Sequence, residues 1–266
     1  MSAQASLMKR VLAILLLVLL SAAGWAGDRK VIVLTFDDGP RPYVLLGKKE
    51  PPSPGLLDLL DRNGIKATFF VMGWRLTPKT WGERHEPNIG VTCLDAAAQV
   101  VKRGHEIENH TYSHAQLRDA EKRYGEAWVL NDVDRGAAVI RPLTNTPSHY
   151  LRPPKWVMWP ELQKKLESRG YTVMSISQDK PAALRDVNSA DYLCAGPPPT
   201  QCPKPSLSDF VLRQIAAREK HGVYAHILTF HELSTTVTTL QTLLPELKAR
   251  GYQFVRLDEY VKVVGR

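Results

Sequence analysis

The chain has 266 residues, of which 44% are hydrophobic and 8% aromatic, which is enough to bury the core of one large domain. Its formal net charge is +8 and its isoelectric point is near 9.4. The Lys and Arg residues are scattered rather than clustered, with no basic stripe interleaved with aromatic residues, so the composition argues against nucleic acid as a partner and favours a solvated basic surface.

The N-terminus has the pattern of a secretory signal. Two basic residues precede an apolar run at 11–20, and small residues then offer cleavage sites after Ala23 or Ala26. The run is shorter than the roughly 20 residues that span a bilayer, although an uncleaved N-terminal anchor remains the alternative. We therefore expect a signal peptide at 1–26 and a domain at 27–266, with no stable membrane insertion after cleavage and a periplasmic or secreted location.

Beyond this segment, strand-like runs alternate with helical runs. Residues 31–36 form a continuous apolar and β-branched run, as in a buried parallel strand. Further strands are predicted at 66–72, 105–109, 171–177, 225–230 and 253–257. Helices are predicted at 56–62, 95–102, 127–140 (before Pro142), 159–169, 210–219 and 237–249. Repeated strand-helix units imply one α/β domain with a mostly parallel sheet, open or closed into a barrel.

The longest stretch without a predicted element is the proline-rich segment 178–208, and long loops of this kind are often functional. It contains Cys194 and Cys202, which we expect to form a disulfide in an oxidising compartment. The third cysteine, Cys93, would then be a small buried residue.

Polar residues follow several of the predicted strands. Asp37 and Asp38 follow the first strand, His110 follows the third, and His231 follows the strand at 225–230. Parallel α/β folds place their active sites at this end of the strands. With His114, two imidazoles and one carboxylate make a ligand set that zinc accepts with one position open for water, and the second carboxylate could deprotonate that water. The pattern indicates a metal-assisted hydrolase. Taken alone, an Asp-Asp-Gly-Pro sequence is more often a surface turn, and a pair of histidines four residues apart is more often a solvated face of a helix.

Five blocks of sequence occur in a distinctive order. They are TFDDGP at 35–40, GIKATFFV at 64–71, GHEIENHTYSH at 104–114, RPP at 152–154 and LTFH at 228–231. The set resembles the polysaccharide deacetylases of the NodB-homology type, also called carbohydrate esterase family 4, and the resemblance covers roughly residues 30 to 260. It implies an irregular (β/α) barrel of about seven parallel strands, one divalent metal ion, and hydrolysis of an N-acetyl group on an aminosugar.

The resemblance assigns roles to the residues that match its motifs. Asp38, His110 and His114 would hold the metal, with one helical turn bringing the two histidines to the same side. Zinc suits two nitrogens and one oxygen, although related ligand sets also accept cobalt or nickel. Asp37 would be the general base for the attacking water.

Four further residues would complete the site. Arg152, after the short segment 149–151, would hold Asp37 and keep it ionised through its positive charge. His231 would protonate the leaving amine. A backbone N–H near Lys155 would help to stabilise the oxyanion, and Leu228 would line the pocket for the acetyl methyl group.

The chain departs from the family pattern in two places. Family members often continue the third motif with an aromatic residue and glycine, whereas this chain has Lys155 and Trp156, so the groove wall there would differ in shape. The fourth motif, usually an aspartate-tryptophan pair that tunes the catalytic histidine, is absent in its usual form. Asp179 is nearest to it in position and Asp191 in pattern, and we favour Asp179.

The sequence therefore predicts an exported, metal-dependent deacetylase that releases acetate from glycans containing N-acetylglucosamine, such as peptidoglycan, chitin oligomers or an exopolysaccharide. Two alternatives remain: an O-acetyl esterase that uses the same site, and a carbohydrate-binding homologue without turnover. Five histidines have no partner in the sequence and are interpreted as structural: His85, His105, His149, His221 and His226.

Overall fold

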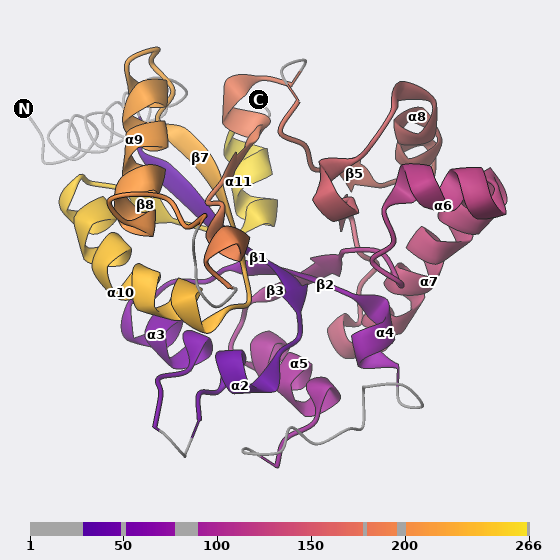
Figure 1. Cartoon of the computed structure of the whole chain (residues 1–266), viewed down its shortest axis with the longest axis horizontal. Helices are drawn as coiled ribbons and strands as arrows, with labels where there is room; N and C mark the ends of the chain where they lie inside the picture. The colour runs from indigo at the N-terminus through magenta and orange to yellow at the C-terminus, as the bar shows by residue number, and fades with distance from the viewer. Residues whose placement is uncertain (1–28, 49–51, 78–89, 178–179, 196–200, 265–266) are drawn as a thin grey trace, which may run out of the picture.

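A parallel sheet forms the centre of the computed structural model, which describes residues 29–48, 52–77, 90–177, 180–195 and 201–264 (Figure 1). Within these residues, seven strands lie in the order β5-β4-β3-β2-β1-β7-β6, and β8 pairs with β1 beside this path. The strands are β1 (Val31–Gly39), β2 (Thr68–Val71), β3 (Glu106–Asn109), β4 (Tyr150–Leu151), β5 (Thr172–Val173), β6 (Asp186–Asn188), β7 (Ala225–His231) and β8 (Gln253–Phe254).

The central strand β1 is buried along almost its whole length, as its continuous apolar run predicts. It pairs with β7 over seven positions, from Val31 opposite Ala225 to Asp37 opposite His231. All strand pairs in the sheet are parallel. The register therefore brings two predicted site residues side by side at the C-terminal edge of the sheet.

The sheet curls until its two end strands approach each other. Ser175, just after β5, forms an isolated parallel bridge with Arg185, just before β6. At this bridge, which we call the seam, the Asp186 N–H donates to the Ser175 carbonyl at 3.0 Å. The predicted irregular (β/α) barrel of about seven parallel strands is confirmed.

Helices surround this sheet, as Figure 1 shows. They are α2 (Pro42–Leu45), α3 (Leu56–Arg62), α4 (Gly73–Leu76), α5 (Cys93–Lys102), α6 (Leu117–Tyr124), α7 (Glu126–Thr144), α8 (Pro160–Ser168), α9 (Leu207–Glu219), α10 (Ser234–Ala249) and α11 (Leu257–Val264). The main core lies between helices and sheet, where Phe36 stacks on Phe69 with ring centroids 5.1 Å apart. None of the helices in the described part of the chain has the length and apolarity to cross a membrane.

Some element boundaries differ from the prediction. The strand predicted at 171–177 is limited to two residues, because the chain turns toward the seam after Val173. Helix α7 continues through Pro142 instead of ending before it. A proline so near the C-terminus removes only one late backbone hydrogen bond, and Leu143 beyond it still packs on the main core. Helices α6 and α11 were not predicted.

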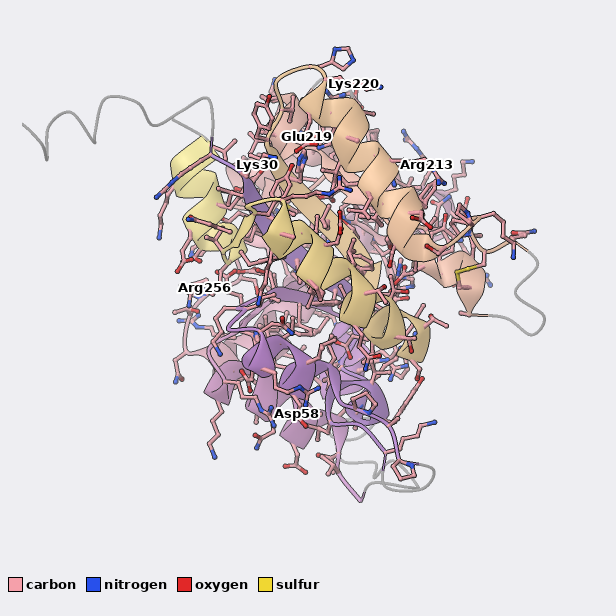
Figure 2. The ribbon with its side chains drawn as sticks, turned by 90° about the vertical axis from the view of Figure 1, so that its left-hand side faces the viewer. Lys30, Asp58, Arg213, Glu219, Lys220 and Arg256 are labelled. Carbon is pink, nitrogen blue, oxygen red and sulfur yellow. A yellow bond between two sulfur atoms is a disulfide. The ribbon has the colours of Figure 1, made fainter. Side chains whose placement is uncertain are left out.

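The proline-rich segment 178–208 carries structure that the sequence did not predict. It contains η3 (Ala182–Leu184), β6 and η4 (Asp191–Cys194). The predicted disulfide between Cys194 and Cys202 is present, visible in Figure 2 as the yellow bond, and Cys93 is buried as expected. The predicted signal at 1–26, together with His85 and Asp179, lies outside the described residues.

Basic and acidic side chains are labelled together on the face shown in Figure 2. Lys30 pairs there with Glu219 at 3.1 Å. Arg256 pairs with Asp258 at 3.1 Å. The labelled cation Lys220 follows Glu219 at the end of α9, near the top of the view, and Arg213 lies further along the same helix to the right. This face therefore mixes charges of both signs.

The interior of the barrel holds a titratable carboxyl group away from the predicted site. Glu108 accepts a hydrogen bond from the Tyr150 N–H at 3.0 Å. Burial, together with the charge of Glu106, raises the pKa of Glu108 to about 8, although the Tyr150 N–H opposes the shift. Because the folded state keeps a proton that the unfolded chain releases near pH 4.5, Glu108 should destabilise the fold increasingly as the pH rises from 4.5 to 8.

The Glu108→Gln protein should therefore be more stable than the wild type at pH 8, by more than about 1 kcal/mol, with a much smaller difference at pH 5. Glutamine keeps the acceptor for Tyr150 and cannot ionise. Urea unfolding of both proteins at the two pH values measures the difference. Equal differences at pH 5 and pH 8 would show that the pKa of Glu108 is not raised.

Candidate functional site

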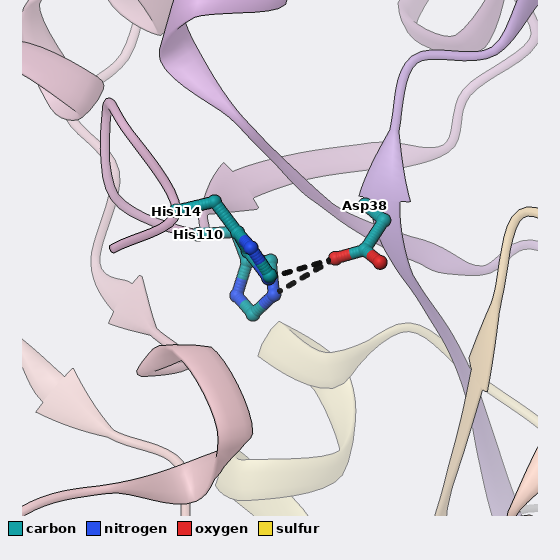
Figure 3. Close-up of side chains that lie close together, drawn as sticks. All are labelled: Asp38, His110 and His114. Carbon is teal, nitrogen blue, oxygen red and sulfur yellow. Dashed lines mark ion pairs between the residues drawn. The ribbon is translucent and has the colours of Figure 1, made fainter. Parts of the chain in front are cut away.

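Asp38, His110 and His114 converge at the C-terminal edge of the sheet, as Figure 3 shows. Asp38 Oδ1 lies 3.4 Å from His110 Nε2 and 3.1 Å from His114 Nε2. Within the described chain, this is the only group of three or more potential ligands with atoms all within 4.8 Å of one another. The structure thus brings together the three predicted metal ligands.

The donor atoms of this group fit a cation. The Nδ1 atom of His110 lies 2.7 Å from the Arg152 carbonyl oxygen, which can only accept, so Nδ1 carries a proton. In the neutral ring, Nε2 then presents a lone pair toward Asp38 Oδ1, a buried oxygen that meets no other donor in the described chain. Two lone-pair atoms facing each other need a proton or a metal ion between them. The residues therefore fit a divalent metal.

The two histidines do not lie on a helix, so the prediction of one helical turn is wrong. The segment from His110 to His114 is an irregular loop, with Thr111 and His114 at positive φ angles of 66° and 61°. Asn109 Oδ1 accepts from the Thr111 N–H at 2.9 Å, and Thr111 Oγ1 accepts from the His114 N–H at 3.1 Å. These bonds hold a conformation that side-chain-bearing residues rarely adopt.

Asp38 also has a positive φ, 68°, at an irregularity in the pairing of β1 with β2. Its burial alone would raise the pKa of the Asp38 carboxyl, but when protons rather than a metal ion occupy the site, hydrogen bonds and charge from the protonated His110 and His114 outweigh burial and hold that pKa well below its usual value. Asp38 is therefore an anion in this setting, as a metal ligand has to be.

Arg152 lies between two carboxylates in the barrel interior. Its Nη1 donates to Asp37 Oδ1 at 2.6 Å, so the predicted contact with Asp37 is present. Its Nε and Nη2 donate to the two oxygens of Asp186 at 3.0 and 3.1 Å. The guanidinium is fully buried, with its central carbon 4.1 Å from the centre of the Phe70 ring. Asp186 was not predicted.

His231 is held by Asp191, and the preference for Asp179 is corrected. Asp191 accepts from the Nδ1 and backbone N–H of His231, both at 2.7 Å, and from Thr236 Oγ1 at 2.5 Å. The sequence pattern around Asp191 identified the partner of His231, whereas position along the chain pointed to Asp179. Position was misleading because strand β6 comes before the segment that contacts His231. Tyr192, the next residue, meets the His231 ring edge-on at 5.5 Å.

The pKa of His231 reflects this contact. Burial would lower the pKa, but the hydrogen bond and charge of Asp191, with smaller contributions from Asp37 and Asp38, raise it to about 9. His231 is therefore mostly protonated at neutral pH.

Asp191→Asn should lower the pKa of His231 from about 9, since burial would remain and only the smaller contributions of Asp37 and Asp38 would oppose it. A pH titration of the imidazole signals by NMR, on metal-free protein, measures this pKa. Asp134→Asn, at an exposed aspartate that pairs with Arg169, serves as the control and should leave it unchanged. A His231 pKa near 9 in the Asp191→Asn protein would contradict the assignment.

Six of the eight predicted site residues line one cleft of about 520 Å³. Its walls are formed by Asp37, Asp38, His110, His114, Pro153, Lys155, Trp156, Ile176, Asn188, Tyr192 and His231. A larger hollow of about 620 Å³ lies over the N-terminal ends of β3 and β4, and it contains none of the predicted site residues. The smaller cleft is therefore the candidate active site.

Two predicted substrate contacts have different outcomes. Lys155 lies at the cleft, in η2 (Pro154–Trp156), with a φ of 57°. Leu228 does not reach the cleft, so its predicted role is corrected: its side chain is fully buried in the main core. Side chains alternate along β7, and Leu228 pairs with Leu34 on the side of the sheet that faces the helices. Ile176, 46% exposed, is instead the aliphatic residue of the cleft.

Comparisons with known proteins agree with this geometry. The family model described as polysaccharide deacetylase matches residues 26–174. A peptidoglycan-N-acetylglucosamine deacetylase of Bacillus cereus is 29% identical over 241 residues, which cover 88% of this chain and 90% of that protein. The peptidoglycan-N-acetylglucosamine deacetylase PgdA of Listeria monocytogenes is 26% identical over 88% of this chain, which spans only 39% of that longer protein.

Solved structures show the same fold. The peptidoglycan deacetylase PdaC of Bacillus subtilis superposes with a TM-score of 0.61 at 21% identity, covering 89% of this chain and 92% of that one. At this identity the likeness establishes the architecture.

Proposed function

The chain belongs to the polysaccharide deacetylase family, and we propose that it is an exported, metal-dependent hydrolase that removes N-acetyl groups from glycans containing N-acetylglucosamine, with release of acetate. One observation carries the proposal: a metal-type ligand set, an aspartate held by a buried arginine and a histidine held by a buried aspartate line the same cleft. The name of the Bacillus cereus relative supports this substrate class.

In this proposal Asp38, His110 and His114 hold the metal. A divalent ion at such a site polarises a carbonyl oxygen and makes a water molecule more acidic. Zinc suits the two nitrogens and one oxygen, and cobalt or nickel are alternatives. The fixed Nδ1 proton of His110 orients that ring for ligation.

The remaining residues move protons and orient the substrate. Asp37 accepts the proton of the attacking water, with Arg152 fixing one of its oxygens. His231, whose pKa is raised to about 9, donates a proton to the departing amine nitrogen. The Lys155 backbone N–H is the proposed donor to the developing oxyanion. Ile176 and Tyr192 offer apolar surface beside these groups.

Acetate release from a panel of glycans tests the proposal. N-acetylglucosamine oligomers and peptidoglycan should yield acetate, and yield should cease after chelation and return with added zinc, cobalt or nickel. Elemental analysis should find about one metal ion per chain. Full activity with metal verified absent would refute the metal-dependent mechanism.

Other outcomes identify the alternatives. Acetate from acetylated xylan but not from N-acetylglucosamine oligomers would indicate an O-acetyl esterase. Tight binding of oligomers without acetate release would indicate a carbohydrate-binding homologue. Peptidoglycan is the first polymer to test, because the Bacillus cereus and Listeria monocytogenes relatives described above carry it in their names.

A further inference from the structure

The two places where this chain departs from the family pattern contact each other. Trp156 stands in η2, after the third motif, and Asp186 stands in β6, within the segment that lacks the usual fourth motif. The indole Nε1 of Trp156 donates to Asp186 Oδ2 at 2.9 Å. Trp156 lines the cleft, whereas the Asp186 side chain is fully buried behind it.

Asp186 also binds one edge of the Arg152 guanidinium group. Its two oxygens accept from Nε and Nη2, which fixes the planar guanidinium in two directions, and the Phe70 ring lies against the guanidinium plane. The remaining donor, Nη1, is then directed at Asp37. The orientation of the proposed base thus depends on a carboxylate that does not itself line the cleft.

The buried charge of Arg152 requires both of its carboxylate partners, Asp37 and Asp186. A guanidinium with no exposed surface needs compensating negative charge and hydrogen bonds. Asp37 supplies one such partner but lies at the cleft, where it has to take up a proton during the proposed reaction. Asp186 supplies a second that stays in place. Arg152 can therefore remain oriented while Asp37 changes its protonation state.

We propose that Asp186 is a positioning residue for two parts of the cleft. It orients Asp37 through Arg152, and it holds the side chain of Trp156, which forms part of the cleft wall, through the indole N–H. The inference rests on the proposed deacetylase function. It assigns two separable effects, because Asp37 is the proposed base of the chemical step whereas Trp156 lines the cleft in which the substrate would bind. Loss of the contact between Asp186 and Arg152 should lower kcat, and loss of the contact between Asp186 and Trp156 should raise KM.

The test uses Asp186→Asn, Trp156→Phe and the double variant in the full chain loaded with zinc. Trp156→Phe keeps an aromatic wall and all charges, and removes only the donor to Asp186. Asp134→Asn is the matched control, because Asp134 also accepts from an arginine and an aromatic hydroxyl, those of Arg169 and Tyr171, but does not line the cleft. Each protein is assayed for acetate release, metal content and thermal midpoint.

Asp186→Asn should lower kcat by roughly 10²-fold, the loss expected from misplacing a catalytic group by about an ångström. It should also raise KM. Trp156→Phe should raise KM by about fivefold, the factor that one hydrogen bond contributes, with kcat nearly unchanged. The double variant should show no larger KM than the more affected single variant, because both changes break the same contact. All variants should retain metal.

Four results would overturn the inference. Wild-type kcat and KM in a folded, metal-loaded Asp186→Asn protein would do so, as would a KM in the double variant equal to the product of the single effects. If Asp186→Asn does not fold, an unchanged KM in Trp156→Phe overturns it and a raised KM supports it. A wild type that releases no acetate from any glycan refutes the proposed function and this inference together, whereas an active wild type with unaffected variants refutes the inference alone.

Discussion

Asp38→Ala should lose both metal and turnover. The variant removes the one oxygen of the ligand set, toward which His110 and His114 both point. Mutation of a group that merely supports a ligand weakens metal affinity by roughly 10- to 100-fold, so removal of the ligand itself should exceed this. His110→Ala and His114→Ala should behave in the same way. Metal content by elemental analysis and acetate release on the same samples measure both effects.

His221→Ala is the matched control for the histidine variants, because His221 is exposed in the turn after α9 and does not line the cleft. It should keep both metal and activity. Asp38→Ala protein that retains one metal ion per chain would remove Asp38 from the ligand set. Retained turnover without metal would remove the ligand set from the mechanism.

Asp37→Asn should keep its metal while turnover falls by roughly 10²- to 10⁴-fold, the contribution of a general base. This corresponds to about 3 to 5 kcal/mol in the activation free energy. The asparagine oxygen can still accept from Arg152 Nη1, and Asp186 still balances the buried charge, so the fold should persist. Metal content, acetate release and the thermal midpoint of the same preparation measure the three expectations.

Variants of the two adjacent aspartates should both lose turnover but should differ in metal content. Asp37→Asn protein that loses its metal, beside Asp38→Ala protein that keeps it, would exchange the two roles. Full activity in Asp37→Asn would show that Asp37 is not the base. Asp134→Asn should change neither metal content nor turnover, since Asp134 lies outside the cleft.

The sequence predicted most of the barrel because long apolar runs carry a strong signal. The strand beginning at Val31 and the helix at 56–62 were identified, the helix with its observed bounds. Strand β6 was missed because three residues are too few for a periodic pattern, and its first residue is a charged one that faces Arg152. Such short strands depend on their neighbours in the sheet rather than on their own composition.

The candidate site was predictable where motif residues follow strands, and less so where geometry depends on tertiary contacts. The approach of Asp38, His110 and His114 followed from strand ends meeting at one edge. The loop that holds the two histidines depends on side-chain bonds from Asn109 and Thr111, which override helical spacing.

Two further residues show the same limit. Leu228 was misplaced because the motif gave its distance from His231 along the chain but not the face of the strand on which it lies. Asp186 carried no local signal, since its partner Arg152 is 34 residues away. Burial of a charged residue beside an arginine is visible only once the chain has folded.

The seam has a consequence for hydrogen exchange. The barrel is closed between Ser175 and Arg185 by one bridge, whereas β1 and β7 are paired over seven positions. Local opening favours the part of a structure with the fewest paired neighbours, so the Asp186 amide should exchange with solvent deuterium faster than the Val33 amide. Because the Asp186 side chain contacts Trp156 at the cleft, a bound glycan should slow exchange at Asp186 more than at Val33. Solvent isotope uptake at one backbone position would then report whether the cleft is filled.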